Sequence, residues 1–526
     1  MKKTITRRLN QSLLAVSITT LLSSGVAMAK SDDMHQLYED NCASCHGSDH
    51  GGYLAPALNS ETLKGRSPTA LRTIVMAGSF DTLMPPFYGK LSDDEIRGVI
   101  KHLQATPKQP NPAWTIDDMK KSLKVYVKDE STLPAKPTFQ IDNIDNLIGV
   151  AARGKYGRGE GSRAIFINSV THQKVGEVPT GVAAHIIDFN PANPRWAYVK
   201  TDTAEIFKVD LYSMQAVRSI KTGWNGPGMG VSRDGKYIMA GSFVPHNAVI
   251  LDADTLEPLK TFELEGIDPD GKMVSSDSGM IIGTPYADIF AIALENAGQV
   301  WIVDYKKEGF PVTKIEKVGR HLHDAFLTHG GKKLMVASYD DSIVAAIDLE
   351  ERKLIKQLPA GCVPHVGGGS AVVVDGRTLG FGTNFGDCDK MVVSVWDLDK
   401  MEVVKQIPVS GGTESPAAHA NAPYVAVDII SKDRRARTVQ LIDKKTLEVV
   451  KTLDVGGHAY FPEYSADGKF LYISAGYNGD EVVVYDSNTL QKVASVPMES
   501  PAGIFSRGRV KYMTRGLSPD EMEQSK

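Results

Sequence analysis

The sequence predicts two domains, an all-α domain followed by an all-β propeller of eight blades. Up to about residue 106, helical segments such as 32–41 and 92–104 carry polar residues at their starts. From about residue 150, short β-rich runs are separated by Gly, Asp, Asn and Pro. The chain has 526 residues, 42% of them hydrophobic, which is enough for two or three domains and a large core.

A repeated unit predicts the number of blades. An apolar strand ending in Asp is followed by a polar turn and a second strand, as in Asn247–Asp252 with Thr255–Lys260. The residues that end these strands, 42 to 52 positions apart, are Asn168, Asp210, Asp252, Asp304, Asp348, Asp397, Asp443 and Asp486. This spacing is typical of four-stranded blades around a central channel, and eight instances favour eight blades over a seven-bladed binding scaffold.

The N-terminus has the pattern of a signal peptide. Basic residues from Lys2 to Arg8 precede an apolar run over 13–22, and Ala27-Met28-Ala29 is a small-x-small cleavage pattern. We therefore expect a signal peptide over 1–29 and export to the periplasm. A membrane anchor is disfavoured because the run is short and contains Ser and Thr, and we expect no membrane span in the mature chain.

The pattern of residues along the chain predicts the domain bounds, and the net charge limits the kinds of partner. We predict an all-α domain over 30–106, a proline-rich linker over 107–148 and the propeller over 149–526. The net charge is −4, and no basic tract is interleaved with aromatic residues, so nucleic acid is not an expected partner. Whether the protein is a monomer or a homodimer is left open.

The segment Cys42-Ala43-Ser44-Cys45-His46 predicts covalent attachment of a c-type haem. The two thiols add to the porphyrin vinyl groups, and His46 becomes an axial ligand of the iron. A zinc site would need two further ligands at metal spacing, and a thioredoxin-like motif would need a βαβ context that the helical flanks do not provide. The first domain is therefore predicted to be a cytochrome c domain with one haem c.

The sixth iron ligand is expected on a loop before the last helix of this domain. Met84 lies in Leu83-Met84-Pro85-Pro86-Phe87, where the prolines favour an extended loop. Met76 is the alternative ligand. A His/Met pair suits electron transfer. We expect His50 and His102 at the surface.

The two remaining cysteines, Cys362 and Cys388, are one strand-turn-strand unit apart. An oxidising compartment would allow a disulfide between them. Two unpaired buried thiols remain an equal alternative, because spacing does not fix the geometry.

Histidines recur at the starts of the predicted blades, which favours a shared pocket at one end of the channel. They are His185, His246, His321, His323, His365, His419 and His458. With Gly181–Ile186 around His185, Leu322-His323-Asp324, Pro364-His365 and a Trp114–Met119 linker segment, the chain resembles the cytochrome cd1 family, which joins a cytochrome c domain to an eight-bladed propeller holding haem d1.

The resemblance implies roles for four residues. It makes His185 the proximal ligand of a non-covalent haem d1, places His323 and His365 on the distal side, and puts Arg153 opposite a haem d1 carboxylate. It further implies reduction of nitrite to nitric oxide, with haem c passing electrons from a small periplasmic cytochrome c or cupredoxin. Two distal histidines would supply the protons.

One departure supports a different activity. Val366-Gly367-Gly368-Gly369 stands where the reductases of the family have Pro-Gly-Arg-Gly. The alternative is a dihydro-haem d1 dehydrogenase, which converts a propionate of this tetrapyrrole to an acrylate and uses haem c as an electron acceptor. It needs a base, for which His458, or His419 with Tyr460, are candidates. A second alternative is an electron-transfer or binding propeller without haem d1.

Overall fold

The computed structural model describes residues 33–63, 68–78, 83–154, 161–367, 371–384, 390–430, 434–476 and 479–510. It divides into two compact units, one of helices up to Pro112 and one of strands from Ala113 onward. This is the predicted fold class. The expected signal peptide, 1–29, lies outside the described residues. Among the described helices, none is both long and apolar enough to cross a membrane.

The helical unit packs its helices around one small core. Its elements are a helix over 33–41, α2 (Ala43–His46), α3 (Pro68–Ala77) and α4 (Asp93–Ala105). A capping box starts α4: the Ser92 hydroxyl accepts from the Glu95 N–H, and the Glu95 carboxylate accepts from the Ser92 N–H. The helix over 33–41 crosses α4 closely, because a Cβ at Gly98 would lie 2.4 Å from the Met34 sulfur.

The segment after residue 113 belongs to the strand unit. It contains α5 (Ile116–Ser122), β1 (Lys124–Val125), η1 (Glu130–Thr132) and η2 (Ile144–Asn146). The Trp114 indole donates to the Lys221 carbonyl at 2.9 Å, and Met119 is fully buried. The part of the predicted linker that follows residue 113 is therefore packed against the propeller.

Eight sheets of four or five strands form the propeller within the described residues. The first four blades are β36 (Pro501–Ser506), β2 (Leu147–Ala152), β3 (Arg163–Asn168) and β4 (Gln173–Pro179); β5 (Ala184–Phe189), β6 (Trp196–Thr201), β7 (Glu205–Asp210) and β8 (Gln215–Lys221), extended by β1; β9 (Met229–Val231), β10 (Tyr237–Ser242), β11 (Asn247–Asp252) and β12 (Pro258–Glu263); and β15 (Ser278–Gly283), β16 (Ile289–Leu294), β17 (Gln299–Asp304) and β18 (Val312–Ile315). A two-stranded hairpin, β13 (Glu265–Ile267) and β14 (Met273–Ser275), separates the third and fourth blades.

The other four blades follow in sequence order. They are β19 (Leu322–Thr328), β20 (Lys333–Ser338), β21 (Ile343–Asp348) and β22 (Lys353–Pro359); β23 (Pro364–His365), β24 (Ala371–Val374), β25 (Arg377–Asn384), β26 (Val392–Asp397) and β27 (Glu402–Pro408); β28 (Pro416–Ala417), β29 (Tyr424–Ile429), β30 (Thr438–Asp443) and β31 (Glu448–Asp454); and β32 (His458–Tyr464), β33 (Phe470–Gly476), β34 (Glu481–Asp486) and β35 (Lys492–Pro497). Two short helices complete the unit, η4 (Arg434–Arg437) and α6 (Arg507–Val510).

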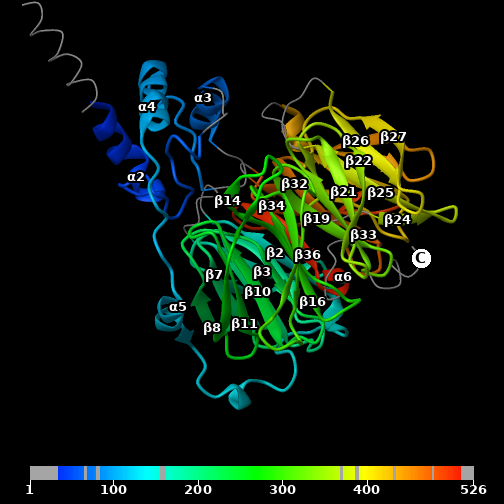
Figure 1. Cartoon of the computed structure of the whole chain (residues 1–526). Helices are drawn as coiled ribbons and strands as arrows, with labels where there is room; N and C mark the ends of the chain where they lie inside the picture. Colours follow the sequence, from blue (N-terminus) through cyan, green and yellow to red (C-terminus); the bar gives the residue numbers. More distant parts are fainter. Residues whose placement is uncertain are drawn as a thin grey trace, which may run out of the picture. The chain divides into compact units, whose positions relative to one another are not determined.

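The ring is closed by strands from both ends of the propeller sequence. The C-terminal strand β36 pairs antiparallel with β2, and the two lie side by side in Figure 1. Each blade contacts the next one around the ring. The strand pairs that make these contacts are β36 with β5, β5 with β9, β9 with β15, β15 with β19, β20 with β23, β25 with β28, β28 with β32, and β32 with β36. The first strand of each blade therefore lines the centre, and all eight inner strands start at the same end of the ring.

The eight residues that predicted the blades all end the third strand of a sheet, as expected. Their side chains explain the repeat. Asp252, for example, accepts from the N–H groups of Asp254 and Thr255 at 3.0 and 2.7 Å, and Asp486 accepts in the same way from Asn488 and Thr489. Such Asx turns begin the connection to the outer strand, so the requirement for Asp is local.

Candidate functional site

Histidines occupy the starts of four inner strands, all at one end of the ring. His185 is the second residue of β5, His323 the second of β19, His365 the last of the short β23, and His458 the first of β32. His246 and His321 lie in connections at the same end, next to β11 and β19. Because inner strands converge at the channel, these side chains border one common opening.

A carboxylate holds His185 in one orientation. The His185 Nδ1 lies 2.9 Å from Asp202 Oδ1 and 3.2 Å from the Arg153 guanidinium. Arg153 is 1% exposed and pairs with the same carboxylate. Burial alone would raise the pKa of Asp202, but Arg153 and His185 outweigh it and lower that pKa. The guanidinium can only donate and has Asp202 as its acceptor, so the shorter contact assigns the Nδ1–H of His185 to Asp202 and leaves Nε2 as the lone-pair nitrogen, an arrangement typical of histidines that bind metals.

His365 is engaged through both ring nitrogens. Its Nδ1 lies 2.8 Å from the Glu414 carbonyl, which can only accept, and its Nε2 lies 2.6 Å from the Asp324 carboxylate. A proton is therefore shared between Nε2 and Asp324, and the ring is buried. The Thr383 hydroxyl also donates to the Glu414 carbonyl, at 2.6 Å, and so helps to hold the acceptor of the His365 Nδ1–H in place.

His323 lies beside His365, with the ring centroids 5.7 Å apart. Its Nδ1 is 2.7 Å from Glu295 Oε1, and its ring contacts Tyr339 at 5.0 Å. Burial would lower the pKa of His323, but the carboxylates of Glu295 and Asp324 outweigh it and raise the pKa to about 9. His323 is thus an imidazolium at neutral pH, and it can donate to an anion.

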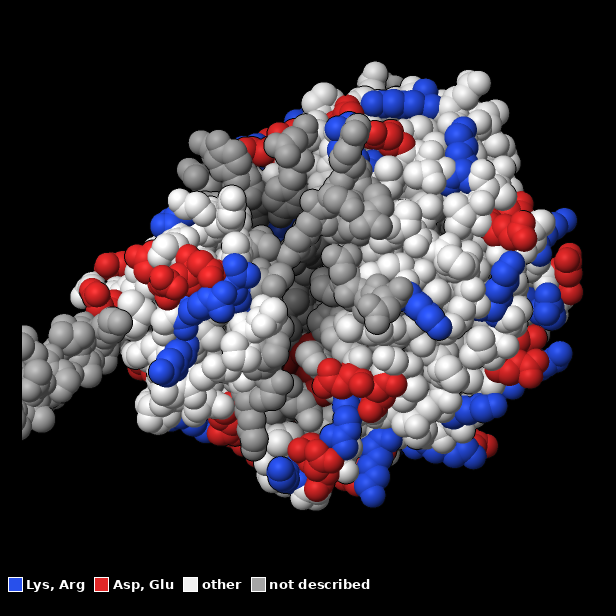
Figure 2. Space-filling view, turned by 90° about the horizontal axis from the view of Figure 1, so that it is seen from above, with Lys and Arg blue, Asp and Glu red and all other residues white. Residues whose placement is uncertain are grey.

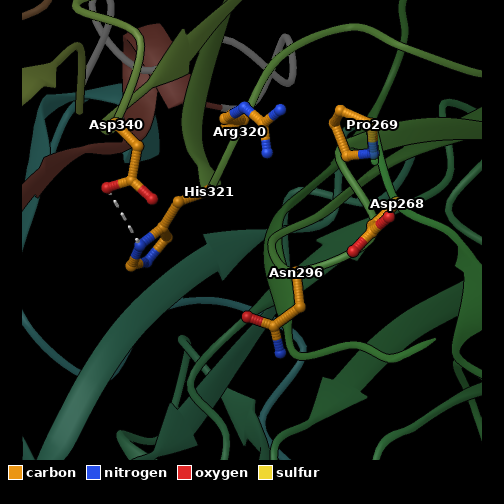
Figure 3. A pocket seen from close by; sticks show the side chains of 6 residues that line it. All are labelled: Asp268, Pro269, Asn296, Arg320, His321 and Asp340. Carbon is orange, nitrogen blue, oxygen red and sulfur yellow. Dashed lines mark ion pairs between the residues drawn. The ribbon is translucent and has the colours of Figure 1, made fainter. Parts of the chain in front are cut away.

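A surface pocket of about 190 Å³ has His321 in its lining, two residues before His323 (Figure 3). Asp268, Pro269, Asn296, Arg320, His321 and Asp340 line it. The His321 Nε2 is 3.4 Å from Glu295 Oε2, and its Nδ1 is 3.9 Å from Asp340. His321 therefore connects the pocket to the buried Glu295, which in turn contacts His323.

A buried acid and a phenol lie on the other side of His365. The Tyr460 hydroxyl donates to Glu414 Oε1 at 2.5 Å, and both side chains are buried. Behind them, Asp428 accepts from the N–H groups of Glu414, Ser415 and Phe461. Burial raises the pKa of Asp428 to about 6 against these hydrogen bonds.

His458 and His419 differ in position. His458 is half-buried at the start of β32, where it pairs with Gly476. His419 follows β28 at the opposite end of the ring, where its Nε2 is 3.3 Å from the Ala466 carbonyl and its Nδ1 accepts from the Asn421 N–H. The fold therefore separates His419 from Tyr460, with which the sequence had grouped it.

The Cys-x-x-Cys-His motif forms the short helix α2. Cys42 and Cys45 are free and half-buried, one helical turn apart. The His46 Nδ1 lies 2.7 Å from the Pro56 carbonyl and must donate to it, which leaves Nε2 as the lone-pair nitrogen. Burial lowers the pKa of His46, so the imidazole is neutral. Met84 and Met76 are both half-buried.

The structure also describes the two histidines that were expected at the surface and one of the two remaining cysteines. His50 is buried at 6% exposure and His102 is half-buried, so the expectation that both lie at the surface was wrong. They face one another across the core of the helical unit. Cys362 is disulfide-bonded, whereas Cys388 lies outside the described residues. Over the face in Figure 2, basic and acidic side chains are interspersed, as the near-neutral charge suggested.

The model of the Cytochrome D1 heme domain family matches residues 144–510. The chain belongs to the cytochrome cd1 family. A second model, that of the cbb3-type cytochrome c oxidase subunit III, matches residues 29–103, in line with a cytochrome c domain. This cytochrome cd1 protein is thus a haem-dependent oxidoreductase by family, as the resemblance implied.

Relatives of the cytochrome cd1 protein include both activities considered above. The dihydro-heme d1 dehydrogenase of Pseudomonas aeruginosa is 27% identical over 95% of this chain and 98% of its own length. A solved structure, dihydro-heme d1 dehydrogenase NirN in complex with DHE, has a TM-score of 0.71 at 26% identity, over 90% of this chain and 99% of that one. The nitrite reductase of Stutzerimonas stutzeri is 24% identical over 94% of this chain and 96% of its own.

Sequence reasoning missed the carboxylates that set the state of each histidine. Asp202, Glu295 and Asp324 are acids in or beside strand connections, a position shared by many surface acids in this chain. No local pattern distinguished them. Only Asp324 had a visible signal, since it follows His323 directly.

Proposed function

We propose that the cytochrome cd1 protein is a dihydro-haem d1 dehydrogenase. The reaction takes a propionate side chain, –CH2–CH2–COO⁻, to an acrylate, –CH=CH–COO⁻, and releases two electrons and two protons. The tetrapyrrole is then the substrate of the propeller and haem d1 its product. Nitrite reduction, the main expectation from sequence, becomes the second candidate, and the relatives above favour this order.

The state of His365 carries the proposal. A nitrite reductase of this family uses two distal histidines as donors to a bound anion, but both nitrogens of His365 already face acceptors within the protein. A rotation that freed Nε2 would remove this ion-pair partner from the half-buried Asp324 carboxylate, which is an unfavourable change. The glycines that follow Val366 point the same way, because the arginine of the reductases is missing there.

The helical unit has the donor set that a haem c requires. Cys42 and Cys45 would form the two thioether bonds, and the neutral His46 would bind the iron through Nε2. Met84 would complete the coordination. Once bound, haem c supplies a one-electron acceptor, so each turnover needs two one-electron steps and an external oxidised carrier.

The propeller would hold the tetrapyrrole at the common opening. His185 is oriented by Asp202 with Nε2 available for the iron, and Arg153 keeps that carboxylate ionised. On the other side, the His323 imidazolium can bind a carboxylate of the substrate, since its charge is stabilised by Glu295. A protonated His323 is a donor at neutral pH and so cannot serve as the base.

Glu414 is our candidate for the proton acceptor, with Tyr460 as its partner. The carboxylate is buried and hydrogen-bonded by the phenol at 2.5 Å, beside the locked His365. Deprotonation of a substrate CH2 group requires such a base close to the side chain. His458 remains a second candidate, because it starts the inner strand that also carries Tyr460.

The proposed location and partner of the enzyme rest on the signal peptide and the haem c that the sequence predicts. We expect a periplasmic protein that passes electrons from haem c to a small carrier, either a cytochrome c or a cupredoxin.

Anaerobic turnover of purified dihydro-haem d1 tests the proposal. Haem c-loaded protein with ferricyanide as the final acceptor should convert the substrate to a product two hydrogen atoms lighter, seen by mass spectrometry. Without ferricyanide, each protein should accept one electron and its haem c band should become that of the ferrous state. No hydrogen loss in the presence of ferricyanide would contradict the proposal.

The competing activity needs its own assay. Protein loaded with haem d1 and supplied with nitrite and a reduced donor should release no more nitric oxide than protein without haem d1. Sustained nitric oxide release would favour the reductase instead.

A further inference from the structure

The helical unit contains a cluster of three histidines that haem attachment does not use. His35 lies on the helix over 33–41, His50 in the connection after α2, and His102 in the last turn of α4. One nitrogen from each ring lies within 4.8 Å of the other two. The ring centroids are 5.5 to 6.4 Å apart, and the planes are inclined by 40 to 56°. The rings therefore converge on a common point rather than stack.

Two of the converging side chains have nitrogens without a hydrogen-bond partner. The Nδ1 of His50 and the Nε2 of His102 are buried, and neither has a donor or acceptor among the described residues. His50 as a whole is only 6% exposed. A buried polar atom without a partner costs about 1–3 kcal/mol, so both nitrogens would gain from binding a ligand.

The protein holds His50 in place by several contacts. Its ring stacks on Tyr38 at 3.9 Å with an angle of 22°, and Tyr38 is itself fully buried and donates to the Gly47 carbonyl. The backbone of His50 is left-handed, with φ of 62°, and its carbonyl accepts from the Leu58 N–H. A histidine fixed in this way loses little conformational entropy when it binds a ligand.

The charge state of the cluster also suits a cation. Burial, together with the neighbouring histidines, lowers the pKa of His50, and burial with His35 lowers that of His102. These shifts favour the neutral form of His50 and His102, which is the form that binds metals. The carboxylates of Glu39 and Asp49 partly counteract this lowering of the His50 pKa. They therefore place negative charge near the cluster, which favours a bound cation.

We propose that His35, His50 and His102 bind one divalent transition-metal ion, Zn²⁺ or an ion of similar preference, with a fourth position open to water. Imidazole nitrogen is a preferred ligand of these ions, and three histidines with one open position form a known coordination type. Zn–N bonds of about 2.0–2.1 Å require the three nitrogens to move somewhat closer together than in the metal-free rings. The exposed His35 can provide most of that movement.

Such an ion would tie the start of the mature chain to the last helix of the domain. His35 lies five residues after the expected first residue, Lys30, and His102 lies on α4, across the close Met34–Gly98 contact. The ion would stabilise the packing of these two helices by mass action. This role does not depend on the chemistry proposed for the propeller.

Zn²⁺ titration of the full haem c-loaded protein tests the site. Calorimetry and metal analysis after desalting should find one tightly bound Zn²⁺ per chain. His35→Gln, at an exposed position that leaves the core intact, and His102→Gln should each weaken binding by at least about ten-fold. Asp40→Asn, on the same helix but outside the cluster, should leave the affinity unchanged.

Two further measurements separate this site from the other cluster with metal-ligand spacing, His323, Asp324 and His365. His323→Gln should retain the tight Zn²⁺. Zinc K-edge absorption of the one-equivalent complex should show a nitrogen and oxygen shell near 2.0 Å with imidazole scattering that diminishes in His35→Gln. Unchanged Zn²⁺ binding in both His35→Gln and His102→Gln, or its loss in His323→Gln, would overturn the proposal.

Discussion

The helical unit and the propeller unit gather their candidate functional side chains over very different lengths of chain. In the helical unit, both thiols and the axial histidine fall within Cys42–His46, on one short helix. In the propeller unit, Arg153 and Asp202 are 49 residues apart, as are His365 and the Glu414 carbonyl. The first site depends on local backbone geometry, whereas the second exists only once the ring has closed.

This difference has a chemical consequence. A local motif fixes which donor atoms lie together, and only a few neighbouring groups then set their hydrogen bonds. The Pro56 carbonyl, which accepts from His46, is an example. In the propeller, His185, His323 and His365 each lie against a carboxylate that is distant in sequence or in the adjoining strand, and that partner decides whether the ring is available as a ligand or as a donor. We therefore expect changes in the helical unit to remove a cofactor outright, and changes in the propeller to adjust one step each.

The largest expected effect is in the helical unit. The double variant Cys42→Ser/Cys45→Ser should contain no covalent haem and should lose all electron transfer to an external acceptor, because no thiol remains for attachment. Haem staining of a denaturing gel and absorption near 550 nm measure the loss. The propeller should keep its β-type circular dichroism. Ser44→Ala, an exposed position in the same motif, is the control and should stain normally. Persistent staining of the double variant would show that the motif does not attach the haem.

Removal of the proposed base should cause the second largest effect, a loss in the rate of dehydrogenation. Glu414→Gln should slow dehydrogenation by about 10²-fold or more, since general-base catalysis contributes about 10²–10⁴-fold. Substrate binding, followed by its absorption, should change little. The matched control is Glu402→Gln on the exposed outer strand β27. An active Glu414→Gln enzyme would transfer the role of base to His458.

Loss of the carboxylate behind His185 should weaken the hold on the tetrapyrrole. Asp202→Asn removes the charge that orients the ring and neutralises Arg153, so we expect affinity to fall by about 10- to 100-fold. Spectroscopic titration with dihydro-haem d1 measures it. Asp375→Asn, an exposed acid in the turn between β24 and β25, is the control. Equal affinity in wild type and Asp202→Asn would mean that His185 does not bind the iron.

The smallest effect concerns pH and stability. The Glu295 and Asp324 carboxylates raise the folded-state pKa of His323 from its ordinary value of 6.5 to about 9, so its stabilising contribution is fully present below pH 6.5 and is lost as the pH rises through 9. Relative to His323→Gln, the wild type should be more stable by about 1–2 kcal/mol at pH 6, and this advantage should disappear near pH 10. Urea unfolding at several pH values measures it. His329→Gln, whose pKa is lowered by burial, should not show this trend. A constant difference at all pH values would contradict the ion pair with Glu295.

Much of the fold was predictable because its signals are local. The capping box of α4 spans four residues, and the strand-ending Asp residues bond to N–H groups two and three residues ahead. The blade count followed from that repeat. The repeat also predicts that His185, His323 and His365 start inner strands at one end of the ring, which is where the strand order places them, whereas their shared pocket stays a prediction.

The partners of those histidines were decided by tertiary structure alone. No short-range rule could pair His323 with Glu295, 28 residues away, or engage both nitrogens of His365. The same holds for His50 and His102, which we expected at the surface and which the packing of the helical unit brings to a ring-centroid separation of 5.5 Å. Residue types and their repeat are carried by the chain itself. Protonation, ligand availability and burial are set by the groups that packing brings within hydrogen-bonding distance.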